Sequence, residues 1–477
     1  MKKTRLLSLL LVALLASQTL ASCDSAAVSE DTTAETTPAE TEPAYLDDLG
    51  DLRFDGEEFV MYLATGNSDY HVEEETGDVM DDAIYERNRV VEERLGITLT
   101  YVDDPADGTG GGQAIKTNNI RQFIMSGDDT YDVYIHVQHT GMPGLIAEGC
   151  FTDWNGLDYV DFSKPYWYAN CLRDINYGDK IMAMTGLYNI ATLTSTNCLF
   201  FNKRLFDEYQ LEYPYQDVLD GTWTIDKFRQ MVEIGTVDID GDTKINFETD
   251  QIGYWGWGYE SVPAMFMGLG GDILLKNESD GQPVLNVETE RNIRIVDAMR
   301  SVFNLDGAAD EYNTYGIFNT AFTSGRLLFV HGHLSLAPTF RDMEDDFGFV
   351  PYPKLDEAQD NYNCRVQNTS GLTYIPVTNN NLSFNGAVLE CMASVSYETT
   401  VPAFFDVVLT VKTARDTESE QMVPIIRECA SFNDEAVSGF SVRNMIAGTQ
   451  ELSSYWAGVK AAVEDSVQKN ILDVYFD

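Results

Sequence analysis

Basic side chains are scarce in this sequence. Its 477 residues include 31 Lys and Arg against 77 Asp and Glu, which gives a formal net charge of −46 at pH 7. A body this acidic repels both phosphate backbones and anionic lipid headgroups. The composition therefore excludes nucleic-acid binding. The simplest interpretation of the negative charge is that it keeps the protein soluble. Attraction of positively charged solutes is the alternative.

Cysteine is also rare, and the seven cysteines form no C-x-x-C pair. Six of them are dispersed through the later chain, as buried small hydrophobic residues often are: Cys150, Cys171, Cys198, Cys364, Cys391 and Cys429. One or two disulfides are compatible with an exported protein. The sequence leaves their pairing open.

Long apolar runs are absent except near the N-terminus. There "MKKTR" supplies basic residues, and Leu6 to Leu15 form an apolar core of about ten residues, too short for a permanent transmembrane helix. We therefore predict that residues 1–22 are an export signal. No later stretch approaches 18 continuous apolar residues, so no other membrane span is expected.

The residues Leu20-Ala21-Ser22-Cys23 resemble the lipobox of bacterial lipoproteins, in which the cysteine is lipidated. Two acyl chains, at about 0.8 kcal/mol per buried methylene, would hold a protein on a membrane. The alternative is an ordinary signal-peptidase site with Cys23 as a spare thiol. We expect Cys23 to anchor the protein on the extracellular face of the cell membrane, with residues 23–50 as a disordered acidic linker.

Enzyme signatures are mostly missing. The chain has no G-x-S-x-G and no H-E-x-x-H, and "DGTGGGQAIK" at 107–116 lacks the spacing of a phosphate loop, so we predict a flexible turn there. With 77 acidic residues, no pair stands out as the acid and nucleophile of a glycosidase. We predict that the protein is not an enzyme. A cell-surface glycoside hydrolase stays open as an alternative on composition alone.

Strand-like and helical runs alternate after residue 50. They predict the order βαβαβ and a parallel sheet with crossover helices. The runs are 57–65, 81–96, 97–102, 120–127 and 131–137. Ligands of such sheets bind at the carboxyl ends of strands. Later, "FNTAFTSGRLLFVHG" predicts a helix, a turn at Ser324-Gly325 and a buried strand.

Several pieces between residues 81 and 419 together carry a family resemblance. They are "DDAIYERNRVVEERLGI", "YVDFSKPYW", "FFNKRLF", "LDGTWTIDKFRQMV", "FTSGRLLFVHG", "RDMEDDFGFVPYPK" and "DVVLTVKTARDTES". In their order and spacing the chain resembles extracellular solute-binding proteins of the sugar-binding family associated with ABC importers, in the lipoprotein form. The resemblance implies a two-lobed, type II periplasmic-binding-protein-like α/β fold with a hinged inter-lobe cleft.

The same resemblance implies a monomer that captures a mono- or oligosaccharide, requires no cofactor and delivers its ligand to ABC permease subunits. It specifies no particular sugar, and a receptor for a peptide or another polar solute is the alternative among binding proteins. We expect the first lobe to contain 51–195 with 315–345. The second lobe would contain 196–314 with 346–477.

Sugar recognition needs flat aromatic faces and planar polar groups. In "GYWGWGYES", Trp255, Trp257 and Tyr259 alternate with glycines, and alternation in a strand places them on one face. They are candidates for ligand contact, with a half-buried strand packed in the core as the alternative. Trp167 in "SKPYWY" is a less favourable candidate.

Polar residues at predicted strand ends are the other ligand candidates, because these positions face a cleft in a parallel sheet. They are Asn67, Gln138, His139 and His331. "HVQH" and "HGH" hold four of the five histidines. Their spacing does not match a zinc-binding helix, so hydrogen bonding to ligand or a structural role is favoured over metal binding.

A calcium-type loop is indicated by "VDIDGDTKINFETD". Asp238, Asp240 and Asp242 occupy its first, third and fifth positions, and Asp250 follows its end. The loop departs from an EF-hand, because its sixth position is Thr243 and its twelfth is a threonine flanked by acids. We predict a possible structural calcium site. An acidic surface turn is the alternative.

Overall fold

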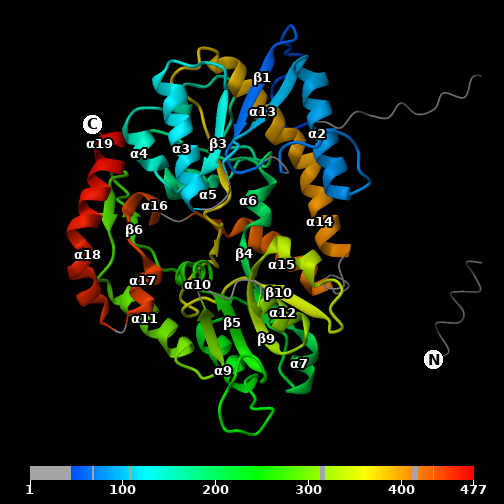
Figure 1. Ribbon diagram of the computed structural model, residues 1–477, viewed down its shortest axis with the longest axis vertical. Helices are drawn as coiled ribbons and strands as arrows, with labels where there is room; N and C mark the ends of the chain where they lie inside the picture. Colours follow the sequence, from blue (N-terminus) through cyan, green and yellow to red (C-terminus); the bar gives the residue numbers. More distant parts are fainter. Residues whose placement is uncertain are drawn as a thin grey trace, which may run out of the picture. The chain divides into compact units, whose positions relative to one another are not determined.

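The computed structural model describes residues 45–66, 69–106, 110–311, 317–410, 417–432, 435–448 and 450–476. The predicted signal segment, Cys23 and Asn67 lie outside the described residues. From Tyr45 onward the chain is one compact unit. It is a mixed α/β structure built around two larger sheets (Figure 1). No helix in the described part is long and apolar enough to cross a membrane.

The first sheet has the strand order β12-β3-β1-β2. β1 pairs in parallel with both β2 and β3, whereas β12 is antiparallel to β3. Helices α2 and α3 connect the parallel strands, which confirms the predicted βαβαβ order. The bounds are β1 Glu58–Leu63, α2 Val79–Leu95, β2 Thr98–Asp103, α3 Gly110–Met125, β3 Val133–Val137 and β12 Gly371–Tyr374.

Local sequence explains both ends of α2. The side chain of Asp78 accepts hydrogen bonds from the backbone of Met80 and Asp81, which caps the first turn. The helix stops at Gly96, where φ is 66°. A Cβ on Gly96 would lie 2.9 Å from the carbonyl oxygen of Phe54, so both the left-handed backbone and the close contact require glycine.

The prediction of a flexible turn at 107–116 is wrong from Gly110 onward, because α3 begins there. Two tertiary hydrogen bonds anchor the middle of this helix. Lys116 donates to the carbonyl of Ala64 at 2.8 Å, and the Thr117 hydroxyl donates to the carbonyl of Thr140 at 2.7 Å. These contacts outweigh the poor helix propensity of glycine.

The second sheet has the order β10-β4-β9-β5-β8. β5 is parallel to β8 and β9, and β4 is antiparallel to β9 and β10. The predicted helix, turn and strand at 318–332 are confirmed as α12, Gly325 with φ of 74° and β9. The bounds are β4 Asn197–Asn202, β5 Ile252–Trp257, β8 Ala308–Glu311, α12 Ile317–Thr323, β9 Leu327–His333 and β10 Phe347–Val350.

The expected lobe boundaries need a correction. We assigned 315–345 to the first lobe, but β9 lies between β4 and β5 in the second sheet. Conversely, β12 joins the first sheet, and Asn385 of α13 (Leu382–Glu398) donates to the carbonyl of Asp132 beside β3 at 3.0 Å. A run of apolar residues predicts that a segment is a buried strand. The sheet that the strand joins depends on partners that are distant in the sequence.

Short extended segments connect the two sheets. Thr196, just before β4, forms an antiparallel bridge with Val366. Next to that bridge, β11 (Cys364–Arg365) pairs in parallel with β13 (Ala430–Ser431). The chain therefore crosses between the sheets in several strands that lie side by side.

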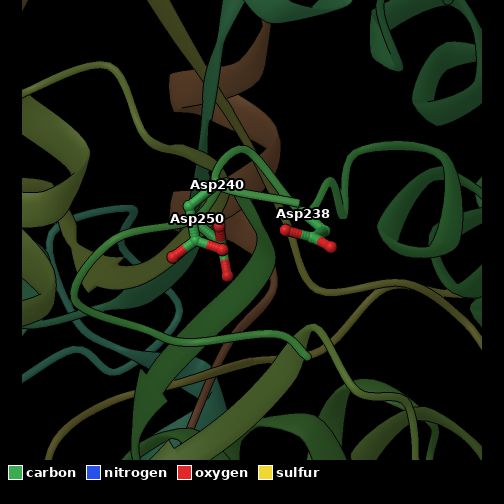
Figure 2. A group of neighbouring side chains, drawn as sticks. All are labelled: Asp238, Asp240 and Asp250. Atoms are coloured by element: carbon green, nitrogen blue, oxygen red, sulfur yellow. The ribbon is translucent and has the colours of Figure 1, made fainter. Parts of the chain in front are cut away.

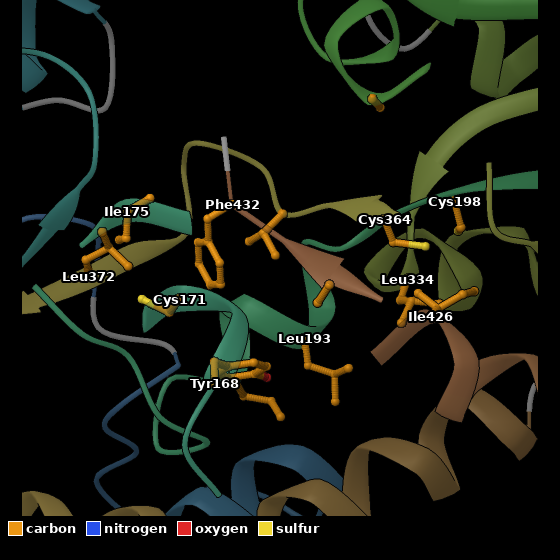
Figure 3. Close-up of a cluster of buried hydrophobic side chains, with 14 of the residues drawn as sticks. Tyr168, Cys171, Ile175, Leu193, Cys198, Leu334, Cys364, Leu372, Ile426 and Phe432 are labelled. Carbon is orange, nitrogen blue, oxygen red and sulfur yellow. The ribbon is translucent and has the colours of Figure 1, made fainter. Parts of the chain in front are cut away.

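The buried region around this crossing contains apolar residues and cysteines (Figure 3). Cys171, Cys198 and Cys364 are fully buried within it. All six described cysteines are free thiols, and only Cys429 is not classed as buried. This confirms their interpretation as small hydrophobic residues of the core.

The remaining helices and strands surround the two sheets (Figure 1). They are α4 Met142–Ala147, α5 Ala169–Ile175, α6 Ile190–Thr194, α7 Lys203–Glu208, α8 Tyr215–Leu219, α9 Ile225–Ile234, α10 Ser261–Gly268, β6 Leu274–Lys276, β7 Pro283–Leu285, α11 Glu290–Phe303, α14 Thr400–Thr410, α15 Thr417–Glu428, α16 Glu435–Ser438, α17 Val442–Ala447, α18 Leu452–Val467 and α19 Asp473–Tyr475.

Candidate functional site

The ends of β3 and β5 bring together a group of aromatic and charged side chains. We call this group the strand-end cluster and define it as His139, Trp257, Tyr259, Glu260 and Arg365. His139 follows β3 of the first sheet, and Trp257 ends β5 of the second. Ligands of parallel sheets bind at these carboxyl ends. The cluster therefore stands where both sheets place functional residues.

The aromatic part of the cluster is open to solvent. Tyr259 is 47% exposed, and Trp257 is partly buried. Their ring centroids are 5.4 Å apart at an interplanar angle of 43°. The guanidinium of Arg443 lies 4.2 Å from the Tyr259 ring centroid, a cation–π contact. The two rings thus offer apolar surface to a flat ligand, with a cation beside them.

The charged part of the cluster is a buried ion pair. Arg365 is 1% exposed, and its guanidinium donates to the carboxylate of Glu260. The Nε atom of Arg365 is buried and has no acceptor among the described residues. A buried polar group without a partner is costly, so this donor is suited to a polar atom of a bound molecule or a water.

His139 connects the cluster to the first sheet. Its Nδ1 lies 3.2 Å from the carbonyl of Asn368, so Nδ1 carries the proton and Nε2 remains an acceptor. Burial lowers the pKa of His139, and the positive charge of Arg365 lowers it further, whereas Glu260 raises it. The charges of Glu260 and Arg365 therefore act on His139, which is the reason for including it in the cluster. At neutral pH His139 is a neutral hydrogen-bonding group.

Two of the predicted aromatic ligand residues belong to the core instead. Trp255 is 3% exposed and packs edge to face on Phe247 with ring centroids 4.9 Å apart. Trp167 is buried, and its Nε1 donates to Glu390 at 2.9 Å. Alternation along β5 places Trp255 and Trp257 on one face, but the loop that carries Phe247 covers only the first.

The predicted strand-end polar residues also divide. His139 lies in the cluster, and Gln138 is buried beside it in sequence. His331 is buried in β9, where its Nδ1 lies 2.6 Å from the hydroxyl of Tyr352. This gives His331 a structural role beneath the site rather than contact with ligand. Asn67 lies outside the described residues.

Sequence reasoning missed three charged residues of this region. Glu260 lies inside "GYWGWGYES", directly before α10. An acidic residue next to an aromatic repeat was a usable signal. Arg365 lies in the two-residue strand β11, which has no periodicity to detect. Arg443 reaches Tyr259 from α17, far along the chain, and no local pattern indicates that contact.

The loop with the calcium-type spacing gathers acidic groups in a different combination (Figure 2). Asp238, Asp240 and Asp250 each place a carboxylate oxygen within 4.8 Å of the others. Asp242 is not in this group, and its carboxylate accepts a hydrogen bond from the backbone N–H of Lys244 at 2.8 Å. Of the four predicted ligands, Asp238, Asp240 and Asp250 therefore converge, and Asp242 does not.

The donor set of this loop fits a hard cation. Backbone hydrogen bonds from Asn246 and Ile239 lower the pKa of Asp250 and orient its carboxylate. Thr243 takes the sixth loop position with φ of 69°, the left-handed backbone that glycine usually supplies there. Three oxygen-bearing groups converge without the bidentate glutamate of an EF-hand, which is consistent with weak binding at most.

Comparison with known proteins finds a family and solved structures that are similar to this chain. The family model described as bacterial extracellular solute-binding protein matches residues 75–379. The chain has no match among curated proteins.

Solved structures share the fold at low sequence identity. The GacH receptor of Streptomyces glaucescens, solved unliganded and with acarbose, has a TM-score of 0.56 at 14% identity, covering 86% of this chain and 99% of that one. The galacto-N-biose/lacto-N-biose I-binding protein of the ABC transporter from Bifidobacterium longum has a TM-score of 0.55 at 12% identity, covering 88% and 96%.

A third structure is UgpB from Mycobacterium tuberculosis in complex with glycerophosphocholine, with a TM-score of 0.52 at 15% identity, covering 87% of this chain and 100% of that chain. Together these likenesses show the two-lobed, type II solute-binding fold that the sequence predicted.

Proposed function

This chain belongs to the bacterial extracellular solute-binding protein family, and on that premise we propose that it captures a mono- or oligosaccharide at the strand-end cluster and delivers it to the permease of an ABC importer. A bound sugar would contact Tyr259 and Trp257 from the second sheet and His139 from the first. A ligand that touches both sides stabilises a closed state by its differential affinity for that state.

The observation that carries the proposal is the combination of open aromatic rings with polar groups at one place. Tyr259 and Trp257 offer faces for the apolar side of a sugar ring. Arg365 offers an unused Nε donor, and His139 offers an Nε2 acceptor. Hydroxyl groups both donate and accept, so a sugar suits this pair of partners.

A polar solute other than a sugar is the second candidate. UgpB, which has the same fold, is solved with glycerophosphocholine. The exposed aromatic face of Tyr259 beside acidic Glu260 is also compatible with a solute of that kind. A panel of ligands therefore has to include glycerophosphodiesters and short peptides beside sugars.

The proposal is tested by thermal unfolding and calorimetric titration against that panel. A bound solute raises the melting temperature in a saturable way. Replacing Tyr259 by Ala should weaken binding at least about tenfold, which corresponds to about 1.4 kcal/mol. Tyr159→Ala is the matched control, because Tyr159 is 48% exposed and lies outside the cluster.

Two outcomes would contradict the proposal. Equal loss of affinity in the Tyr159 and Tyr259 variants would remove the cluster from the site. Conversion of any sugar to products would favour the glycoside hydrolase alternative.

We also propose that Cys23 is lipidated and holds the protein on the extracellular face of the membrane. The support is the complete Leu20-Ala21-Ser22-Cys23 pattern after an export segment. Lipid attachment keeps the binding body near its permease and so raises its effective concentration there. Cys23→Ser should move the protein from the membrane fraction to the medium, and retention of the variant on the membrane would refute the anchor.

A further inference from the structure

The described residues line a cavity of about 380 Å³. Its walls come from four separate parts of the chain, namely α5, the segment from α10 to β6, Asn363 just before β11, and the segment from β13 to α17. No residue of the strand-end cluster lines it. Its volume falls in the range of pockets that bind small molecules, about 300–1,000 Å³.

Apolar side chains form much of the wall. Phe266 of α10 and Phe432, which follows β13, are both buried and line the cavity. A Cβ on Gly271 would lie 2.6 Å from the Phe266 ring, so glycine is needed for the backbone to pass this ring. The next residue, Asp272, is thereby placed at the same cavity as Phe266.

The cavity wall carries three carboxylates, of Asp174, Asp272 and Glu435, against two basic side chains, of Arg173 and Lys276. Both basic residues of the lining are engaged elsewhere. Arg173 bonds to Asp174, with 2.5 Å between Nε and Oδ1, and Lys276 donates to main-chain carbonyls at the end of α5, including that of Asn176. Asp272 accepts from the backbone of Leu274 at 3.1 Å, and no basic side chain of the described residues forms an ion pair with it.

We propose that this cavity is a second binding site, which takes a small organic cation with its ammonium group at Asp272 and its apolar body against Phe266 and Phe432. Such a ligand matches both the apolar wall and the Asp272 carboxylate, which has no ion-pair partner among the described residues. The acidic chain as a whole attracts cations toward the site. The site goes beyond the proposed solute binding, since it uses none of the same residues.

The titration of Asp272 supports the assignment. Desolvation by the surrounding protein raises its pKa to about 6, and the negative charge of Asp174 raises it further, whereas the hydrogen bond from Leu274 and the charges of Arg173 and Lys276 lower it. Asp272 is therefore ionised at pH 7.5 and largely neutral at pH 5. A cation held by this carboxylate should bind more weakly at the lower pH.

Benzylammonium, benzyl alcohol and benzoate form a probe set that shares one apolar body. Calorimetric or NMR titration of the full chain at pH 7.5 should show saturable binding of benzylammonium, at least tenfold tighter than benzyl alcohol, and no binding of benzoate. Asp272→Asn keeps the acceptor for Leu274 but removes the charge. It should therefore weaken the binding of benzylammonium about tenfold and leave the affinity for benzyl alcohol unchanged. Asp226→Asn, on α9 outside the cavity, is the matched control.

Each other result overturns the site. Undetectable benzylammonium binding, or equal affinity in the Asp272 variant, removes the proposal. Loss of benzylammonium binding in Tyr259→Ala but not in Asp272→Asn would place the cation at the strand-end cluster instead. Because solute binding is read separately in the Tyr259 variant, failure of one site is distinguishable from failure of the other.

Discussion

His136 is a buried titratable residue in the middle of β3. It is fully buried, and its Nε2 lies 2.9 Å from the hydroxyl of Thr117 in α3. Burial lowers the pKa of His136 to about 4, with smaller contributions from the charges of His139 and Lys116. Since an unfolded histidine has a pKa of about 6.5, the unfolded chain takes up this proton first as the pH falls.

We therefore predict that His136 makes the fold sensitive to acid. Its contribution to the free energy of unfolding is present above pH 6.5 and is lost as the pH falls toward 4. At pH 5 the loss is about 2 kcal/mol. In His136→Gln, the difference in unfolding free energy between pH 7 and pH 5 should be smaller than in the wild type by about that amount. Chemical denaturation at both pH values measures it, and an unchanged difference would contradict the pKa shift.

Single residues also show where sequence reasoning succeeded and failed at the site. Trp257, Tyr259 and His139 could be singled out because an aromatic repeat and a strand end are local signals, and their contact with ligand stays a prediction. Trp255 has the same local pattern and was assigned wrongly, because Phe247 covers it in the folded chain. Arg365 was missed because a two-residue strand has no period.

At the scale of elements, strongly patterned segments were predictable and their partners were not. β1, β2 and β3 follow from β-branched runs between capped helices. β9 was recognised as a buried strand but placed in the wrong lobe, because pairing with β4 depends on residues more than a hundred positions away. Helix α3 was partly missed, because it has a glycine-rich start and is anchored by tertiary hydrogen bonds at Lys116 and Thr117.

The acidic loop before β5 carries a prediction at this scale. We expect calcium to bind to Asp238, Asp240 and Asp250 with a dissociation constant on the order of 10⁻⁴–10⁻³ M. Asp240→Asn should abolish the calcium-induced rise in melting temperature, because this residue supplies one of the three converging carboxylates. It should fold normally, since its carboxylate accepts one exposed backbone hydrogen bond, from Asp242 at 3.1 Å.

Asp242→Asn is the matched control for this loop, because Asp242 lies outside the converging group. It should keep the response to calcium. A calcium response that survives in the Asp240 variant and disappears in the Asp242 variant would restore the EF-hand-like spacing read from the sequence. No response in the wild type would leave the loop as an acidic surface turn.

At the scale of the whole molecule, the crossing strands determine how the two sheets can move. Few chain segments cross between them, at Thr196 and Val366 and at β11 with β13. Small changes in backbone angle in such connections allow two bodies to rotate without breaking either core. Arg365 of β11 lies both in this connection and in the strand-end cluster. On the proposed function, we expect Arg365 to link ligand contact to this motion.

The last prediction concerns closure on solute. Solute bound between His139 and Tyr259 contacts groups from both sheets, so it should shift the population toward a more compact state. Small-angle scattering should show a radius of gyration lower by on the order of 1 Å, against roughly 22 Å expected for a body of about 430 residues. His139→Ala should weaken this change more than it weakens binding, because Tyr259 and Trp257 still hold the solute from one side. A saturated complex with the radius of the free protein would show that binding does not involve closure.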